Sequence, residues 1–271
     1  MLHLFYKTLA VIILLLLFFV TGGGISQNGK WKIEQIQVEG TNESDRNKLL
    51  LFTQEKLKGN YLFMYARENS YLFPKREIEE GILHEFPRLK NVRVSRIDYH
   101  TLSLTVAERE HFALWCGEEF LSAHILEDCW FIDNTGFVFE HAPTFSTGVY
   151  FEVYGALERA GEDTPLRAVL PRGRFNLALS FMQELQKEHI SLLRIFIKPE
   201  EEYGVVVNSS EHNPYLRDTE ILFKEGQDSS MLIKNLLAAL PVQFPIGSVL
   251  IKKLLYIDLR FGNKIYFGFE K

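Results

Sequence analysis

Two cysteines are the residues whose type and spacing most directly suggest chemistry in this chain of 271 residues. Cys116 and Cys129 are too far apart for a CxxC redox or zinc motif, and no second Cys/His pair stands at ligand spacing. In an oxidising compartment the two thiols could form a disulfide, because Trp115-Cys116 and Cys129-Trp130 would lie side by side if they flank one hairpin. Two reduced, buried thiols are the alternative, and the sequence leaves both open.

Other residue types that perform catalysis lack a partner at the spacing their chemistry requires. His84-Glu85 lacks the second histidine of a HExxH zinc site, and neither a G-x-S-x-G elbow nor a Walker glycine loop occurs. Neighbouring carboxylates such as Glu79-Glu80 diverge on a helix or loop, which is typical of solvated faces. The eight histidines are scattered along the chain. The sequence therefore predicts a protein that is not an enzyme and that holds no cofactor or metal.

An apolar stretch near the amino terminus predicts a membrane segment. Residues after Thr8 are apolar as far as Val20, and with Thr21, three glycines and Ile25 the stretch reaches the ~20 residues that a membrane span requires. We expect an uncleaved anchor with the amino terminus inside the cell, because the run is long and no alanine-type cleavage box follows it. A cleavable signal peptide behind Lys7 is the alternative. Both predict that the rest of the chain is exported.

The composition predicts one folded, exported body behind that segment. The chain is 46% hydrophobic and 13% aromatic, which suffices for one core or two small ones. A net charge of −5, with both signs mixed along the chain, argues against a surface that binds nucleic acid or anionic lipid.

Residues 31–107 have the pattern of a compact β-α-α-β-β domain. After a first strand, a helix is expected to begin near Ser44, where a side-chain oxygen can cap free N–H groups. A second helix is expected between Pro74 and Pro87. Alternating apolar and polar residues then predict a hairpin over residues 92–106, with one face in water.

Residues 108–271 predict a second domain of the α+β class, in which helices cover one face of a mainly antiparallel sheet. Helices are expected over about residues 174–189 and from Asp228 to Pro241, where the proline ends the helix. Strands are expected over residues 192–198, 203–207, 219–223, 248–259 and 264–269.

The segment from Tyr256 to Lys271 predicts a β-hairpin whose second strand is a docking edge. Apolar residues alternate with polar ones up to Phe261, Gly262-Asn263 supplies the turn, and the alternation then resumes. An edge strand carries unpaired N–H and C=O groups, which must be covered or offered to another chain. No proline blunts this edge.

The order and spacing of several motifs resemble those of the bacterial division proteins FtsQ and DivIB. The stretches EFPRLKNVRVSR (residues 85–96) and TLSLTVAERE (residues 101–110) are similar to the POTRA domain of that family. The motifs ALW (residues 113–115), DNTGFVF (residues 133–139) and IDLRF (residues 257–261) are similar to its second, β domain. The resemblance thus extends over most of the chain behind the apolar segment.

The resemblance implies an anchor at residues 1–30, a POTRA domain at 31–107 and a β domain at 108–271. It also implies a scaffold without enzymatic activity, which sits in the cytoplasmic membrane at the division septum with one membrane pass. Such a scaffold recruits single-pass partners similar to FtsB/DivIC and FtsL, and so links division to septal peptidoglycan synthesis. The positions that match the family's partner-binding strand are Arg260, Phe261, Asn263, Gly268 and Phe269.

Several features depart from the family's pattern. The basic cytoplasmic tail is nearly absent, the segment from Gly117 to Asp128 is longer than the family's turn, and Lys264 stands where glycine is more frequent. The alternative function is an exported POTRA module of outer-membrane assembly or secretion, which chaperones extended substrates by strand addition. That function predicts several repeats or a carboxy-terminal barrel, and the sequence contains neither.

Overall fold

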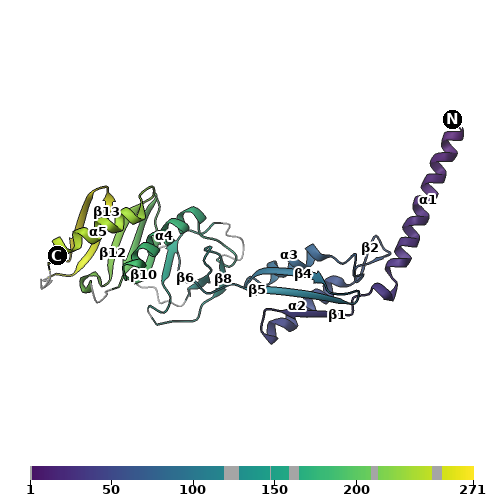
Figure 1. Ribbon diagram of the computed structural model, residues 1–271, viewed down its shortest axis with the longest axis horizontal. Coiled ribbons are helices and arrows are strands. Elements are labelled where there is room, and N and C mark those ends of the chain that lie inside the picture. The colour runs from purple at the N-terminus through teal and green to yellow at the C-terminus, as the bar shows by residue number, and fades with distance from the viewer. Residues whose placement is uncertain (1, 119–127, 147, 159–164, 209–212, 246–251) are drawn as a thin grey trace. The chain divides into compact units, whose positions relative to one another are not determined.

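The computed structural model describes residues 2–118, 128–146, 148–158, 165–208, 213–245 and 252–271. The chain forms two compact units, Met1–Arg109 and Glu110–Lys271, which we term unit 1 and unit 2 (Figure 1). Each unit has a hydrophobic core of its own.

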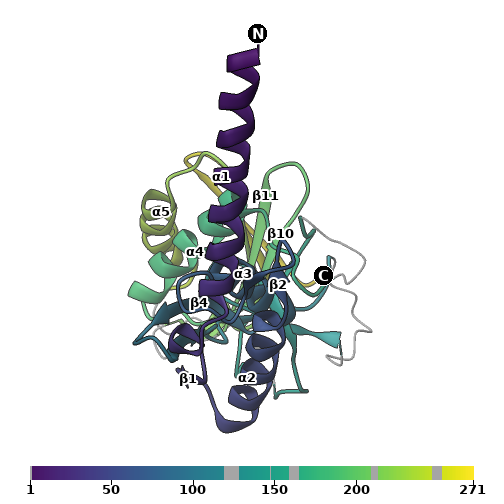
Figure 2. The same ribbon diagram turned by 90° about the vertical axis from the view of Figure 1, so that its right-hand side faces the viewer.

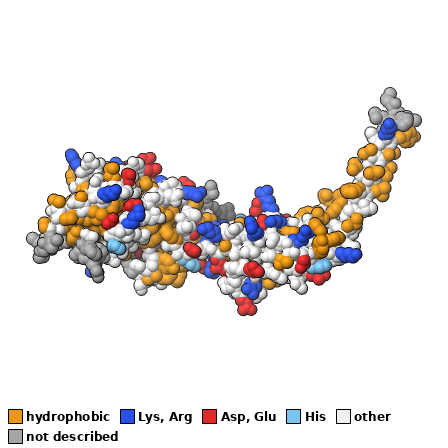
Figure 3. All heavy atoms as spheres, in the orientation of Figure 1, with side chains coloured by type: hydrophobic (Ala, Val, Ile, Leu, Met, Phe, Trp, Pro, Cys, Tyr) orange, Lys and Arg blue, Asp and Glu red, His pale blue; other side chains and the backbone are white. Residues whose placement is uncertain are grey.

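Unit 1 begins with the long helix α1 (Leu2–Ser26). Its residues Phe5–Ser26 are long and apolar enough to cross a membrane. Leu14 and Phe18 are 68% and 75% exposed, and Figure 3 shows apolar side chains along the helix. A helix that exposes apolar side chains in this way suits a lipid surrounding better than water. The length and composition of α1 therefore match the predicted membrane segment.

The core of unit 1 lies between a three-stranded sheet and two helices. The sheet has the order β1 (Gln35–Glu39), β5 (Thr101–Glu108), β4 (Leu89–Arg96), with β1 parallel and β4 antiparallel to β5. The helices are α2 (Glu43–Leu57) and α3 (Lys75–Glu85), and a short 3-10 helix, Gly29–Trp31, follows α1. Leu49, Ile78 and Val94 are fully buried between these layers.

Two details of unit 1 differ from the expectation. Helix α2 begins at Glu43, next to the predicted start at Ser44, but its cap is Asn42, whose side chain accepts a hydrogen bond from the Asp45 N–H. A small hairpin of β2 (Asn60–Tyr61) and β3 (Tyr65–Ala66) was not predicted, since strands of two residues are too short to show a period of two. This hairpin lies beside the carboxyl-terminal end of α1 (Figures 1 and 2).

Unit 2 is built on a nine-stranded sheet with the order β14-β13-β12-β11-β10-β9-β6-β7-β8. Three neighbouring pairs are parallel, β6 with β9, β9 with β10 and β12 with β13, and the other pairs are antiparallel. The strands are β6 (Ala113–Trp115), β7 (Trp130–Ile132), β8 (Val138–His141), β9 (Glu152–Gly155), β10 (Leu192–Ile197), β11 (Glu202–Val207), β12 (Thr219–Lys224), β13 (Leu254–Phe261) and β14 (Lys264–Phe269).

Five of these eight pairs are antiparallel, so the described sheet is mainly antiparallel as predicted, but the three parallel pairs that make it mixed were not predicted. The helices explain the parallel pairs, because parallel neighbours need a crossover connection, which a helix usually supplies. Helix α4 (Arg172–Lys187) connects β9 to β10, and helix α5 (Ser229–Gln243) connects β12 to β13. A further 3-10 turn, Pro214–Leu216, precedes β12.

The core of unit 2 contains a stack of aromatic rings. Phe223 of β12 lies between Phe181 of α4 and Tyr203 of β11, with ring centroids 4.0 and 4.9 Å away. All three side chains are fully buried. They join a helix to two neighbouring strands, so they hold α4 against the sheet.

The ends of α5 confirm one prediction and correct another. The Asp228 side chain accepts a hydrogen bond from the Met231 N–H and caps the helix, as predicted. Pro241 does not end the helix, which continues to Gln243. The loss of one backbone hydrogen bond is tolerated there because the helix has only its last turn left to form. Part of the strand expected over residues 248–259 lies outside the described residues, and β13 begins at Leu254.

Candidate functional site

The candidate site is the free edge of the large sheet at β14. This strand pairs with β13 in antiparallel register, with Ile257 opposite Phe267 and Asp258 opposite Tyr266. Among the residues that the structure describes, no strand pairs with the other side of β14. Its outward N–H and C=O groups are therefore available to an added strand.

A backbone hydrogen bond of Glu270, the residue that follows β14, shows which backbone groups of β14 point away from the sheet. The Glu270 N–H donates to the Lys253 carbonyl at 2.9 Å, so the Glu270 backbone faces the β13 side. Backbone groups alternate along a strand, so Gly268 and Tyr266 also face β13. The backbone groups of Ile265 and Phe267 therefore face away from the sheet.

The aromatic side chains at this edge divide between two environments. The rings of Phe267 and Phe269 lie 5.8 and 6.3 Å from the ring of Phe244, and both pack against the core of unit 2. Phe261 is 56% exposed and contacts the exposed ring of Tyr266. Of the two phenylalanines at positions that match the family's partner-binding strand, Phe261 is thus largely exposed, whereas Phe269 is partly buried against the core of its own unit.

Gly268 of β14 leaves room for the side chain of Tyr256, which lies opposite it on β13. A Cβ atom on Gly268 would lie 2.1 Å from Cε1 of the Tyr256 ring. Glycine leaves this space free, so the ring rests on the backbone of β14. The structure therefore explains Gly268 by contact with Tyr256 within the hairpin.

A groove runs between β14 and α5, on the face of the sheet that carries the helices. Its volume is about 600 Å³, and Asn263 lies at its β14 side. Val242 on α5 is 81% exposed. The lining combines small, apolar and amide side chains from both elements: Asn235, Ala238, Ala239, Val242, Gln243, Asn263, Ile265 and Phe267. A strand added to β14 would find room in this groove for those of its side chains that lie beside Ile265 and Phe267, on the same face of the sheet.

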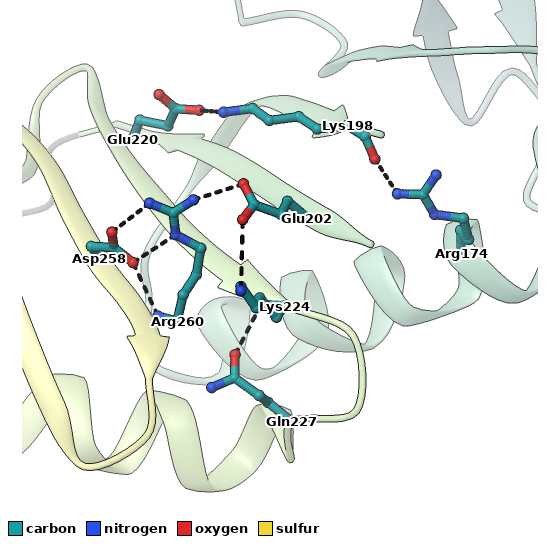
Figure 4. Close-up of polar contacts among 8 residues, drawn as sticks. All are labelled: Arg174, Lys198, Glu202, Glu220, Lys224, Gln227, Asp258 and Arg260. Atoms are coloured by element: carbon teal, nitrogen blue, oxygen red, sulfur yellow. Dashed lines mark hydrogen bonds and ion pairs between the residues drawn. The ribbon is translucent and has the colours of Figure 1, made fainter. Parts of the chain in front are cut away.

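On the other face of the sheet, Arg260 belongs to a network of ion pairs (Figure 4). Its guanidinium donates to Asp258 Oδ2 and to Glu202 Oε2, each at 2.6 Å. Lys224 Nζ lies 3.9 Å from the other oxygen of Glu202. Arg260 is one of the positions that match the family's partner-binding strand, and the structure pairs its guanidinium with two carboxylates of its own chain.

This network shifts the pKa values of both central groups. Burial alone would raise the pKa of Asp258, but hydrogen bonds from the Arg260 side chain and backbone outweigh burial and hold the pKa below its usual value. The hydrogen bonds to Asp258 raise the pKa of Arg260, which stays charged at all relevant pH values. Asp258 is only 5% exposed, so its charge depends on Arg260.

Asp258→Asn is therefore expected to lower the free energy of unfolding by about 1–3 kcal/mol at neutral pH. Because the folded-state pKa of Asp258 is depressed, its contribution is present above the unfolded-state pKa of about 3.9 and is lost as pH falls through the folded-state value. The difference between wild type and variant should shrink below about pH 4. Denaturant unfolding at a series of pH values measures it. Asp218→Asn is the control, because the Asp218–Lys253 pair is exposed and contributes little. If the difference in free energy of unfolding between wild type and Asp258→Asn stays constant down to the lowest pH measured, the charge of Asp258 does not have this role.

The two cysteines form a disulfide that closes one end of the β6–β7 hairpin. Trp115 pairs with Trp130 in the antiparallel ladder, which brings the Cα atoms of Cys116 and Cys129 to 4.3 Å. Both residues are buried in a small cluster with Phe131 and Tyr154. Most of the loop that the disulfide closes, residues 119–127, lies outside the described residues.

Several parts of the site could not be anticipated from the sequence. The α5 side of the groove was predicted only as a helix with an inward face, and the exposure of Val242 follows from the continuation of the helix past Pro241. Glu202 lies 58 residues before Arg260, and no local pattern joins them.

Among the described residues, no group of three or more His, Cys, Asp or Glu side chains is placed to hold a metal ion. Neither a family model nor a curated protein matches the chain.

Proposed function

We propose that the chain is a membrane-anchored scaffold of the bacterial division machinery, of the kind that FtsQ and DivIB represent. In this proposal α1 crosses the cytoplasmic membrane once with the amino terminus inside, unit 1 is a POTRA domain and unit 2 is the β domain. The observation that carries the proposal is the edge at β14, with which none of the described strands pairs on its outer side, on a chain whose helix α1 is apolar enough to span a membrane. The motif order described above supports the same family.

The partner is a small single-pass protein similar to FtsB/DivIC, together with an FtsL-like protein. Its exported segment would add to β14 as an extended strand, with backbone hydrogen bonds to the outward groups of Ile265 and Phe267. Apolar side chains on one face of that segment would enter the groove beside α5. On the opposite face, Phe261 and Tyr266 offer exposed aromatic surface, which typically contributes strongly to binding.

Localisation tests the proposal most directly. A fluorescent protein fused to the full chain is expected to concentrate at the division septum, and FtsB/DivIC-like and FtsL-like proteins are expected to co-purify with it. A fusion that carries only α1 is the control, because it keeps the membrane segment and lacks both units. A uniform envelope signal without these partners would instead favour a module of outer-membrane assembly or secretion, which handles extended substrates by strand addition.

A further inference from the structure

The tip of the β2–β3 hairpin combines exposure with an unusual backbone. Leu62 and Phe63 have positive φ values of 45° and 69°, and they are 68% and 97% exposed. Turn positions of this kind usually carry Gly, Asn or Asp, because a larger side chain is strained there. The chain therefore places two large apolar side chains at positions that neither backbone conformation nor contact with water favours.

The hairpin is fastened to the last turns of α1. The Tyr65 hydroxyl donates to the Phe19 carbonyl at 2.9 Å, and the two rings lie 5.2 Å apart. The Gln27 side chain donates to the Met64 carbonyl at 2.9 Å, and the Ala66 N–H donates to Ser26 Oγ at 3.1 Å. The hairpin and the end of α1 therefore form one packed element.

The glycines near the end of α1 make this close approach possible. A Cβ atom on Gly22 would lie 2.9 Å from the Tyr65 hydroxyl, and one on Gly23 would lie 2.9 Å from Sδ of Met64. Gly23 is buried, although the rest of the helix is largely exposed. These two glycines thus have a structural purpose, which is to seat the hairpin against the helix.

The depth of this contact follows from the length of α1. The apolar part, Phe5–Ser26, contains 22 residues, and at 1.5 Å per residue it extends over about 33 Å, against about 30 Å for the hydrocarbon core of a bilayer. Phe19 lies roughly two turns before the end of that part, or about 10 Å along the helix. If the end of the apolar part marks the outer boundary of the hydrocarbon core, the side chains that touch Phe19 and Gly22 lie within about 10 Å of that boundary, on its membrane side.

Aromatic residues next to α1 fit the same boundary. Trp31, in the turn directly after α1, contacts Tyr71 and Tyr99 with ring centroids 5.3 and 4.9 Å away. The guanidinium of Arg96 lies 4.1 Å from the ring of Tyr71. Trp and Tyr are enriched where a membrane meets water, because their rings are apolar and their polar atoms reach solvent.

From these contacts we propose that the turn Leu62-Phe63-Met64 inserts into the outer leaflet of the membrane beside α1. The occupant of this apolar patch is the lipid bilayer, because the patch is continuous with a helix that is itself surrounded by lipid. Insertion is driven by apolar side chains and requires no anionic lipid, which agrees with the acidic net charge of −5. The inference rests on α1 spanning the membrane, but not on any role in division.

A fluorescent label at the hairpin tip tests this insertion. In Phe63→Cys the new thiol is the target for an environment-sensitive dye, since Cys116 and Cys129 are joined in a disulfide. The full chain is reconstituted into phosphatidylcholine vesicles, with and without lipids that carry a quenching spin label on the acyl chain. The dye is expected to emit at shorter wavelength than in water and to lose most of its fluorescence when the spin-labelled lipid is present.

Leu51→Cys is the control, because Leu51 is a large apolar residue on the surface of α2 in the same unit and is 67% exposed, close to the 68% of Leu62 at the hairpin tip. Its dye is expected to emit as in water and to keep its fluorescence. Equal behaviour of the two labelled variants in vesicles would overturn the inference. A blue-shifted but unquenched label at position 63 would also overturn it, because it would place a protein surface on the tip. A chain that fails to remain with the vesicles would refute the anchor itself, and septal localisation without lipid contact would leave the proposed function standing.

Discussion

Ile265→Pro is expected to weaken binding of a partner segment to β14 by at least about tenfold, which corresponds to about 1.4 kcal/mol. The N–H of Ile265 faces away from β13, so proline at this position removes a donor that an added strand would use, and its ring obstructs the approach of that strand. The ladder between β13 and β14 keeps its own hydrogen bonds. Titration calorimetry with the exported segment of an FtsB/DivIC-like protein from the same cells measures the loss.

Two further variants separate this effect from loss of folding. Ile265→Ala removes the side chain from the groove but keeps the N–H, so it should bind more tightly than Ile265→Pro. Tyr266→Pro acts on the opposite side of the strand, because the N–H of Tyr266 faces β13, and it should lower the melting temperature of unit 2. If Ile265→Pro and Ile265→Ala bind equally well while both remain folded, the edge of β14 is not the docking site.

Removal of the disulfide is expected to have the largest effect on stability. Cys116 and Cys129 are separated by 13 positions, and the chain-entropy model gives on the order of 3 kcal/mol for a loop of about this length. For a unit of the size of unit 2, that loss corresponds to a fall in melting temperature of roughly 6–12 °C. Calorimetry of Cys129→Ser, and of the wild-type chain with and without reductant, measures it.

Alkylation of the purified chain shows whether the disulfide forms in the cell. Wild-type chain purified without reductant should resist alkylation even in denaturant, and reductant should not change the melting temperature of Cys129→Ser. Two alkylated cysteines in the untreated protein would show that the chain keeps both thiols reduced. A disulfide that persists in cells would support an oxidising, extracytoplasmic location of unit 2.

Periodicity in the sequence predicted the elements that carry long, regular patterns. The strands around Ile195, Val205 and Ile221 and the cap at Asp228 follow from local residue types, and the structure contains all of them. The three parallel pairs in the sheet were not predicted, because strand direction depends on which strands are neighbours, and periodicity does not show which strands pair. The path of α5 past Pro241 shows that proline near a helix end does not by itself locate that end.

The candidate site was predicted in outline but not in its details. The alternation in residues 264–269 indicated a strand that pairs with the preceding one, and the structure contains it as β14. Packing of the partly buried Phe269 ring against Phe244 and pairing of Arg260 with Glu202 depend on contacts between distant segments. A motif shared with a family marks positions in a chain, but the surrounding packing decides which of those side chains reach the surface.

The pairing of β14 with β13, and of β13 with β12, also determines how this edge would carry a mechanical load. Both ladders run along the same strand axis. A segment added to β14 and pulled along that axis loads each ladder in shear, so its hydrogen bonds share the force and must break together. A pull across the sheet would instead peel β14 away from β13 one bond at a time. An attachment at this edge therefore withstands tension along the strand much better than tension across it.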